Sequence, residues 1–120
     1  MPHTAKELGA LGEQVAASYL ESHGYAIVAR NFTARWAELD IIARKDKTLV
    51  FVEVKTRTSY SHGAPHEAIT FRKLQHLKRS INLFLLQNPH HNLKLQIDVI
   101  SVMLSPSGEL QSLKQYEHIW

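Results

Sequence analysis

Two nearby stretches of the sequence each carry a pair of charged residues. The first pair is Glu38 and Asp40, and the second is Glu53 and Lys55. Glu53 and Lys55 lie near the end of the mostly apolar stretch 48–56, which is typical of a buried strand. Side chains alternate along a strand, so Glu53 and Lys55 point the same way, roughly 6–7 Å apart, and Glu38 and Asp40 share a face by the same rule. Converging carboxylates could hold a hard divalent cation, with an ammonium beside an attacking water. The pattern therefore predicts metal-assisted cleavage of phosphodiester bonds.

Each of these charges also has a structural explanation. Asp40 could be a strand-end aspartate that faces water, and Glu53 could simply form a salt bridge with Lys55. Apolar neighbours flank Glu53 on both sides, and burial among them would raise its pKa unless a cation or a donor lay near it. A salt bridge on one strand explains neither Asp40 nor Glu38. For that reason we favour a shared site.

Two helices can be predicted from the spacing of apolar residues. Such residues recur every three or four positions in 5–23 and again in 67–88, which indicates two amphipathic helices. Thr4 followed by Glu7 is a capping-box pattern at the start of the first helix. Gly9 and Gly12 within that helix are unfavourable for helix formation, so they indicate close packing.

Four strands are expected at 25–31, 37–44, 49–56 and 94–103. The short polar turn 45–47 should join the second and third strands into an antiparallel hairpin. The range 58–65 is rich in Ser, Gly and Pro and is expected to be a loop, and the last dozen residues a short hairpin arm or an irregular tail. The order αβββαβ predicts an α/β fold, a mixed central sheet with a β-hairpin flanked by helices, in one domain spanning 1–120.

Positive charge is concentrated in one part of the chain, although the net charge is only +3. Positions 55–79 contain six basic residues and only one acidic residue, Glu67. The basic residues are Lys55, Arg57, Arg72, Lys73, Lys78 and Arg79. A local positive excess beside carboxylates suggests an anionic substrate that spans several phosphates. Arg57, Arg72, Lys73 and Arg79 are therefore candidate nucleic-acid-binding residues. A solvated helix face would give the same pattern.

Composition excludes several other classes of protein. The chain has no cysteine, which removes disulfides, thiol catalysis and cysteine-based zinc sites. It has no apolar run near 18 residues and no signal-peptide pattern at its start, so we expect a cytoplasmic protein that does not span a membrane. Its eight histidines form no known four-ligand pattern, which disfavours zinc.

Asp40, separated by twelve residues from Glu53-x-Lys55, resembles the core motif of the PD-(D/E)XK nuclease superfamily. The resemblance extends over roughly residues 9–103. In order and spacing this range is similar to the YraN family, a bacterial family related to archaeal Holliday-junction resolvases. The matching stretches are Gly12-Glu13, Leu20 through Gly24-Tyr25, Asn31, AELDII from Ala37, FVEVKTR from Phe51, AITFRK from Ala68 and IDVISV from Ile97.

The resemblance implies a restriction-endonuclease-like fold and a role for each matching residue. Asp40 and Glu53 would bind Mg²⁺ or Mn²⁺, helped by the backbone carbonyl of Val54. Lys55 would orient or activate the attacking water and stabilise the charge that develops on the phosphate. Glu13 would complete the acidic cluster.

Glu38 would support the acidic cluster that Glu13 completes.

The activity that the resemblance implies is that of a metal-dependent endonuclease, which hydrolyses DNA, including branched or otherwise structured DNA. A homodimer would suit such a substrate.

The chain also departs from the family pattern. Arg35-Trp36-Ala37 stands where relatives carry a glycine pair, and Phe71 and Leu74 replace a usual Pro and Gln. Trp36 could cover the site, stack on a base or only pack against the fold. Two alternatives to a nuclease therefore stay open: a protein that kept the nuclease fold and binds nucleic acid without cutting it, and an interaction module that binds no nucleic acid.

Overall fold

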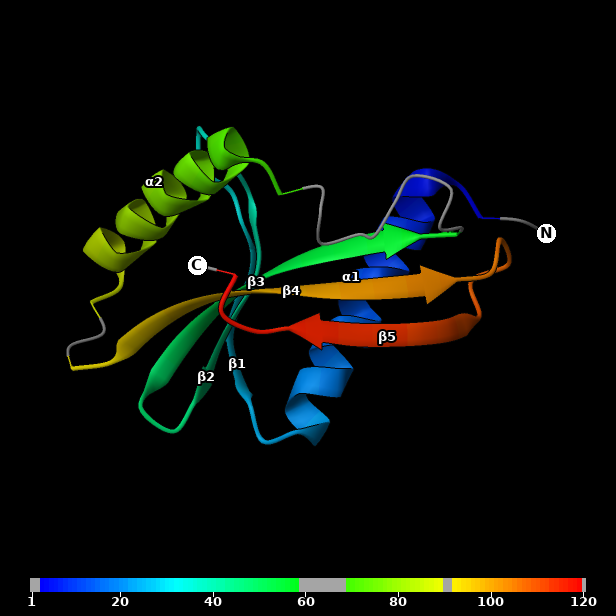
Figure 1. Ribbon diagram of the computed structural model, residues 1–120, viewed down its shortest axis with the longest axis horizontal. Coiled ribbons are helices and arrows are strands. Elements are labelled where there is room, and N and C mark those ends of the chain that lie inside the picture. Colours follow the sequence, from blue (N-terminus) through cyan, green and yellow to red (C-terminus); the bar gives the residue numbers. More distant parts are fainter. Residues whose placement is uncertain (1–2, 59–68, 90–91, 120) are drawn as a thin grey trace.

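The structure is a computed structural model that describes residues 3–58, 69–89 and 92–119. The described residues form two helices and one five-stranded sheet, as Figure 1 shows. In chain order they are α1 (Ala5–Ser22), β1 (Ala26–Phe32), β2 (Leu39–Lys45), β3 (Thr48–Arg57), α2 (Phe71–Gln87), β4 (Lys94–Leu104) and β5 (Leu110–Tyr116). The expected mixed α/β sheet flanked by helices is confirmed.

The strands lie in the order β1-β2-β3-β4-β5. The pair β3 and β4 is parallel and the other neighbouring pairs are antiparallel, so β2 and β3 form the predicted hairpin. The connection from β3 to β4 contains α2, as a parallel crossover requires. The final strand β5 extends the predicted order to αβββαββ, and it pairs with β4 as the hairpin arm that was one of two expectations for this end of the chain. The predicted loop 58–65 lies almost entirely outside the described residues.

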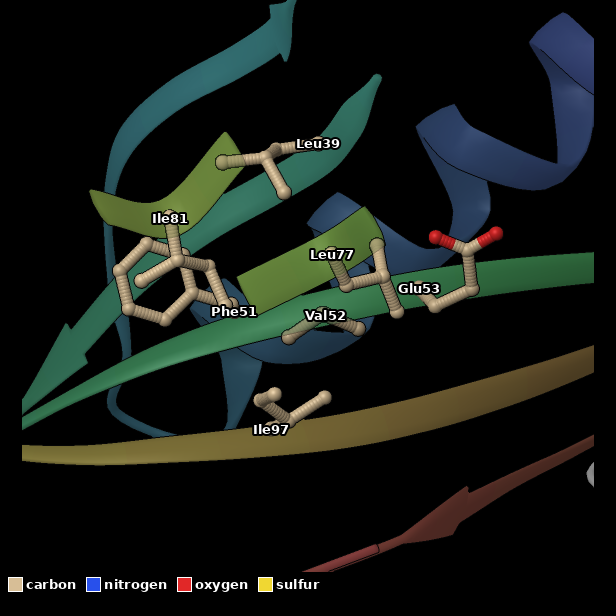
Figure 2. A pocket seen from close by; sticks show the side chains of 7 residues that line it. All are labelled: Leu39, Phe51, Val52, Glu53, Leu77, Ile81 and Ile97. Carbon is tan, nitrogen blue, oxygen red and sulfur yellow. The ribbon is translucent and has the colours of Figure 1, made fainter. Parts of the chain in front are cut away.

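One face of the sheet packs against α2. The apolar side chains Leu77 and Ile81 of α2 contact Leu39, Phe51 and other buried residues of the strands, and Figure 2 shows several of these side chains together. The helix begins at Phe71 rather than at residue 67, because Thr70 is the N-cap and its hydroxyl accepts a hydrogen bond from the Lys73 N–H at 3.1 Å. Residues 67 and 68 lie outside the described part of the chain.

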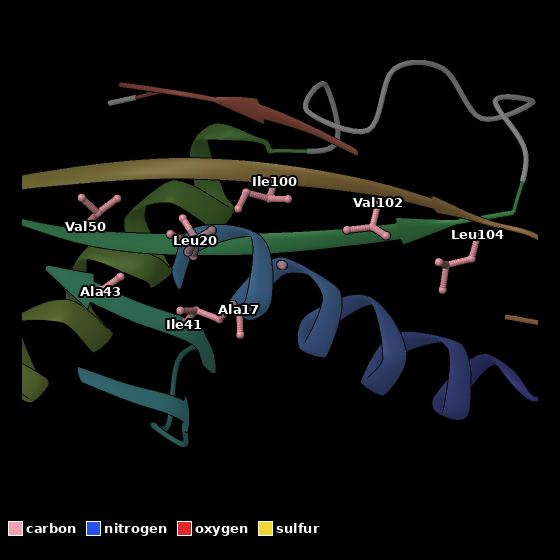
Figure 3. Packing of buried hydrophobic residues seen from close by; sticks show 10 residues of the cluster. Ala17, Leu20, Ile41, Ala43, Val50, Ile100, Val102 and Leu104 are labelled. Carbon is pink, nitrogen blue, oxygen red and sulfur yellow. The ribbon is translucent and has the colours of Figure 1, made fainter. Parts of the chain in front are cut away.

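The opposite face packs against α1, and Figure 3 shows this second cluster. Leu20 of α1 lies among Ile41, Val50 and Ile100 of three strands. Ile41 belongs to this cluster whereas its neighbour Ile42 belongs to the other, which is the alternation expected of a strand buried on both faces.

Two features of α1 set its position. The predicted capping box is present, since Glu7 N donates to Thr4 Oγ1 at 3.1 Å and Thr4 N donates to Glu7 Oε1 at 2.8 Å. Gly12 lies directly against Thr56 of β3, where a Cβ atom would collide with the threonine side chain. The close packing expected at Gly12 is thus present, but the same expectation for Gly9 is wrong, because a Cβ there would meet nothing within 4 Å. The contact at Gly12 holds α1 close to the C-terminal part of β3, and Glu13 is the next residue of the helix.

Asp98 on β4 is fully buried and ties the last strands together. Its carboxylate accepts hydrogen bonds from Gln96 and Gln115, each at 2.8 Å, and from the backbone N–H of His118 at 3.1 Å. These partners lie on β4, on β5 and on the segment after β5, so Asp98 has a structural role.

Among the residues that the structure describes, neither helix has the length and apolar character needed to cross a bilayer.

Candidate active site

The β2–β3 hairpin opens at Asp40. The ladder between the two strands runs from Lys45–Thr48 to Ile41–Val52, and its continuation would place Asp40 opposite Glu53. The Asp40 side chain instead accepts a hydrogen bond at Oδ2 from the backbone N–H of Val54, at 2.8 Å. This bond fixes the Asp40 carboxylate between the two strands, next to Glu53 and Val54.

Three carboxylates meet at this opening. One oxygen from each of Glu13, Glu38 and Asp40 lies within 4.8 Å of the other two. They come from α1, from the residue just before β2 and from β2 itself. Glu13 and Asp40 are half-buried and Glu38 is exposed. Segments that are distant in the sequence therefore present their acidic groups to one small volume.

Asn31, near the end of strand β1, connects two of these groups. With its amide nitrogen facing the carboxylates, Asn31 donates to Glu13 Oε1 at 2.6 Å and to Glu38 Oε1 at 3.2 Å. The residue has a positive φ of 53°, a conformation that asparagine tolerates better than most residues. It matched the family pattern, but its contact with Glu13 depends on where α1 crosses the sheet, and neither contact was predicted.

Burial and neighbouring acidic groups raise the pKa of Asp40 and of Glu13. Burial and then the charge of Glu53 raise the pKa of Asp40 to about 7; the Val54 hydrogen bond opposes this shift, and Glu13 and Glu38 add to it. Burial and the charge of Glu38 also raise the pKa of Glu13, against the effects of Arg30 and Asn31. Ionising all of these groups together is therefore unfavourable without a cation, and a divalent cation would remove most of that cost.

Glu53 lies beside this cluster and contacts two lysines. It is only 7% exposed, and its Oε1 is 3.5 Å from Lys55 Nζ and 3.6 Å from Lys73 Nζ. The Lys55 contact is the salt bridge that the sequence left open as a structural alternative. The contact with Lys73, which comes from α2, was not predicted, since Lys73 was expected among the nucleic-acid-binding residues.

One signal for Lys73 is visible in the sequence. Lys73 stands three residues after the N-cap Thr70, where α1 has Glu7 after Thr4. A cation near the positive end of a helix is unfavourable, so its presence in the first turn indicates an anion nearby. Which anion it meets depends on how α2 docks on the sheet, and the sequence does not specify that.

A small cavity lined mostly by apolar side chains lies next to Glu53. Figure 2 shows the Glu53 carboxylate at one end of a small cavity, with the apolar lining residues to one side of it. The cavity volume is about 10 Å³, enough for one water at most. It is too small for a substrate. The apolar lining residues are Leu39, Phe51, Val52, Leu77, Ile81 and Ile97.

The remaining basic candidates lie outside the carboxylate cluster. Arg57 ends β3, two residues beyond Lys55, and is half-buried. Arg72 and Arg79 are exposed on α2, and the Arg79 guanidinium lies 6.0 Å from the centre of the Trp36 ring. Trp36 is 37% exposed, so this contact leaves part of its surface open to solvent.

Comparison with known proteins identifies the family. The model of the uncharacterised protein family UPF0102 matches residues 12–102. A UPF0102 protein of Syntrophomonas wolfei is 46% identical over 99 residues, covering 82% of this chain and 86% of the relative. A UPF0102 protein of Clostridium botulinum (strain Loch Maree / Type A3) is 40% identical over 115 residues, covering 95% and 94%. The chain belongs to UPF0102, the YraN family, as its motifs indicated.

Among solved structures, the fold is similar to that of an XisH family protein from Nostoc punctiforme PCC 73102. The TM-score is 0.44 at 13% identity, over 86% of this chain and 98% of the other.

Proposed function

We propose that this protein is a metal-dependent endonuclease that hydrolyses phosphodiester bonds in DNA, including branched or otherwise structured DNA. The observation that carries the proposal is the meeting of Asp40 with Glu13 and Glu38 within 4.8 Å, where the β2–β3 hairpin opens. Perturbed pKa values are common at functional sites, and here neighbouring carboxylates help to raise the pKa of Asp40 and of Glu13.

The donor set fits a hard cation such as Mg²⁺ or Mn²⁺. Every side chain in the acidic cluster offers carboxylate oxygen, and spacings up to 4.8 Å suit two oxygens on one ion, because ligand distances are about 2.0–2.6 Å. Asp40 and Glu53 would hold the ion with the backbone carbonyl of Val54, and Glu13 would complete the set, supported by Glu38. The bound cation would lower the pKa of a water and neutralise charge on the phosphate.

The other residues of the site have roles around that cation. Lys55, half-buried and 3.5 Å from Glu53 Oε1, orients the attacking water and stabilises charge on the phosphate oxygens. Arg57, Arg72 and Arg79 bind neighbouring phosphates of the DNA. A homodimer would offer two such sites to the two strands of a junction. DNA as a substrate and a chain without cysteine both suit the cytoplasm.

The test is a cleavage assay on linear, flapped and four-way DNA with Mn²⁺ or Mg²⁺. The wild-type protein is compared with Asp40→Asn and Glu53→Gln, which remove charge with little change in shape. We expect the wild type to cut and both variants to lose activity. Equal cleavage by all three proteins would identify a contaminant and contradict the proposal.

The second candidate function is a protein that binds nucleic acid without cutting it. It is favoured by the engagement of Glu53 with two ammonium groups, which leaves this carboxylate neutralised without a metal ion. In the same assay it predicts no cleavage by the wild type, together with tight binding that weakens steeply as salt rises.

A further inference from the structure

Glu53 has more positive charge beside it than one carboxylate needs. A single oxygen, Oε1, lies within 3.6 Å of two ammonium groups, one from β3 and one from α2. One lysine would be enough to neutralise Glu53. The second is explained by the neighbours, because the acidic cluster of Asp40, Glu13 and Glu38 lies close enough for the charge of Glu53 to act on Asp40 and on Glu13. Lys73 therefore supplies positive charge at the place where the proposed cation would bind.

The two lysines are held differently. Lys55 is 21% exposed and lies on the same strand as Glu53, two residues away, so the strand itself fixes their relation. Lys73 is 34% exposed and reaches Glu53 from a helix, through a flexible four-carbon side chain. When a divalent cation binds Glu53 it repels both ammonium groups, and the more exposed of the two can leave at lower cost.

Lys73 does not stabilise its own helix. The first turn of α2 contains Arg72 and Lys73 and no acidic residue, so the helix dipole disfavours both cations. The equivalent position in α1 is Glu7, which completes a capping box. Helix stability therefore does not account for Lys73, and its position next to the exposed Arg72 suits contact with a phosphate instead.

We propose that Lys73 is a displaceable counter-ion of Glu53. In the absence of metal, the Lys73 ammonium pairs with the Glu53 carboxylate. After metal binding, it moves to a phosphate of the nucleic acid. The proposal rests on the metal site of the proposed function. It makes Lys73 a positioning residue that couples metal binding to substrate binding, and it gives Lys73 opposite effects on the two ligands.

The first experiment measures Mn²⁺ affinity without DNA, by isothermal titration calorimetry. Lys73→Met removes the ammonium and keeps most of the side chain; Lys73→Arg keeps a cation. Lys47→Ala, in the turn at the opposite end of the hairpin, controls for the loss of one positive charge. We expect Lys73→Met to bind Mn²⁺ roughly two- to fivefold more tightly than the wild type, the factor that a partly exposed ion pair is worth. Lys73→Arg and Lys47→Ala should match the wild type.

Equal or weaker Mn²⁺ binding by Lys73→Met, with wild-type binding intact, would overturn this inference and leave the metal site standing. No Mn²⁺ binding by any of the proteins would overturn the proposed function as well. Thermal unfolding of each variant confirms that it is folded, and Lys73→Gln replaces Lys73→Met if the latter is not.

The second experiment measures DNA affinity against salt concentration, in EDTA and in Ca²⁺, which takes the same kind of oxygen ligands. The slope of log affinity against log salt reports the number of phosphates contacted. We expect Lys73→Met to lower this slope by about one in Ca²⁺ and to leave it unchanged in EDTA. An equal decrease under both conditions would mean that Lys73 contacts DNA without being displaced, and would overturn the proposal.

Discussion

The carboxylate of Asp40 accepts a hydrogen bond from the backbone N–H of Val54 at 2.8 Å, at the point where the ladder between β2 and β3 ends. A side chain here takes the place of the next backbone partner. The bond aligns Asp40 without needing a cation for this purpose, and it leaves the charge of the carboxylate to be balanced by something else.

Asp40→Asn separates the charge of this residue from its hydrogen bond. The amide oxygen can still accept from Val54 N–H, so we expect the free energy of unfolding at neutral pH to stay within about 1 kcal/mol of wild type or to rise. Cleavage should fall by at least about 100-fold, because a proposed metal ligand is lost. Denaturant unfolding and a cleavage assay measure the two effects. The control is Asp46→Asn in the exposed turn after β2, and similar cleavage by both variants would contradict the assignment of Asp40.

The stability of the metal-free protein should depend on pH through Asp40. Its pKa is raised to about 7 in the folded protein, from an ordinary value of 3.8. The folded state therefore holds an extra proton between these values, so the contribution of Asp40 to stability is complete below pH 4 and is lost as pH rises through 7. We expect wild type to lose more stability than Asp40→Asn between pH 4 and pH 8, by denaturant unfolding in EDTA. Parallel curves for the two proteins would show that Asp40 ionises normally.

Divalent cations should oppose this loss. A cation competes with the proton on Asp40, so Mg²⁺ or Mn²⁺ should raise the melting temperature more at pH 8 than at pH 5. The same measurement on Asp40→Asn should show a much smaller difference between the two pH values. A stabilisation of the wild type that does not depend on pH would place the bound ion elsewhere on the protein.

Glu13→Gln should bring the pKa of Asp40 closer to its ordinary value. The charge of Glu13 is one of the causes that raise the pKa of Asp40, although burial and Glu53 contribute more, so the decrease should be partial. Carboxyl-carbon NMR during a pH titration measures it directly. Glu21→Gln, at an exposed position on the same helix, is the matched control. An unchanged Asp40 pKa in Glu13→Gln would mean that the two groups do not share a site in solution.

The contact between Gly12 and Thr56 can be tested with a pair of glycine substitutions. Gly12→Ala should destabilise the protein by about 1–3 kcal/mol and reduce cleavage, because the new methyl group pushes α1 and Glu13 away from β3. Gly9→Ala, where the space is open, should be neutral or stabilise by up to about 1 kcal/mol. Adding Thr56→Ala to Gly12→Ala should restore part of the loss. Equal unfolding free energies for the two single variants would contradict the close packing.

Local patterns in the sequence predict much of this fold. Ile41 and Ile42 alternate between the two cores, so strict alternation of polar and apolar residues is absent, yet an unbroken apolar run between turn signals still indicated a strand. The hairpin followed from its short polar turn. The strand β5 was harder to predict, because an edge strand can leave most of its side chains exposed, as Leu110–Tyr116 does.

The candidate site was predictable where its residues are close in the sequence. Asp40, Glu53 and Lys55 lie on one hairpin: strand pairing brings Asp40 near Glu53, and alternation places Lys55 on the same face as Glu53. Lys73 meets Glu53, and Asn31 meets Glu13, only because of how the two helices dock on the sheet, and docking depends on the whole core. Glu13 was placed there only by resemblance to a family; its approach requires the glycine contact that lets α1 pack closely against β3.

One divalent cation should bind between the two strands of the opened hairpin. Crystals soaked in Mn²⁺ would locate it through the anomalous signal of the ion. We expect a peak within about 2.0–2.6 Å of carboxylate oxygens of both Asp40 and Glu53, with Lys73 Nζ moved away from Glu53. Crystals that bind Mn²⁺ at other positions, while these carboxylates stay free of metal, would contradict it.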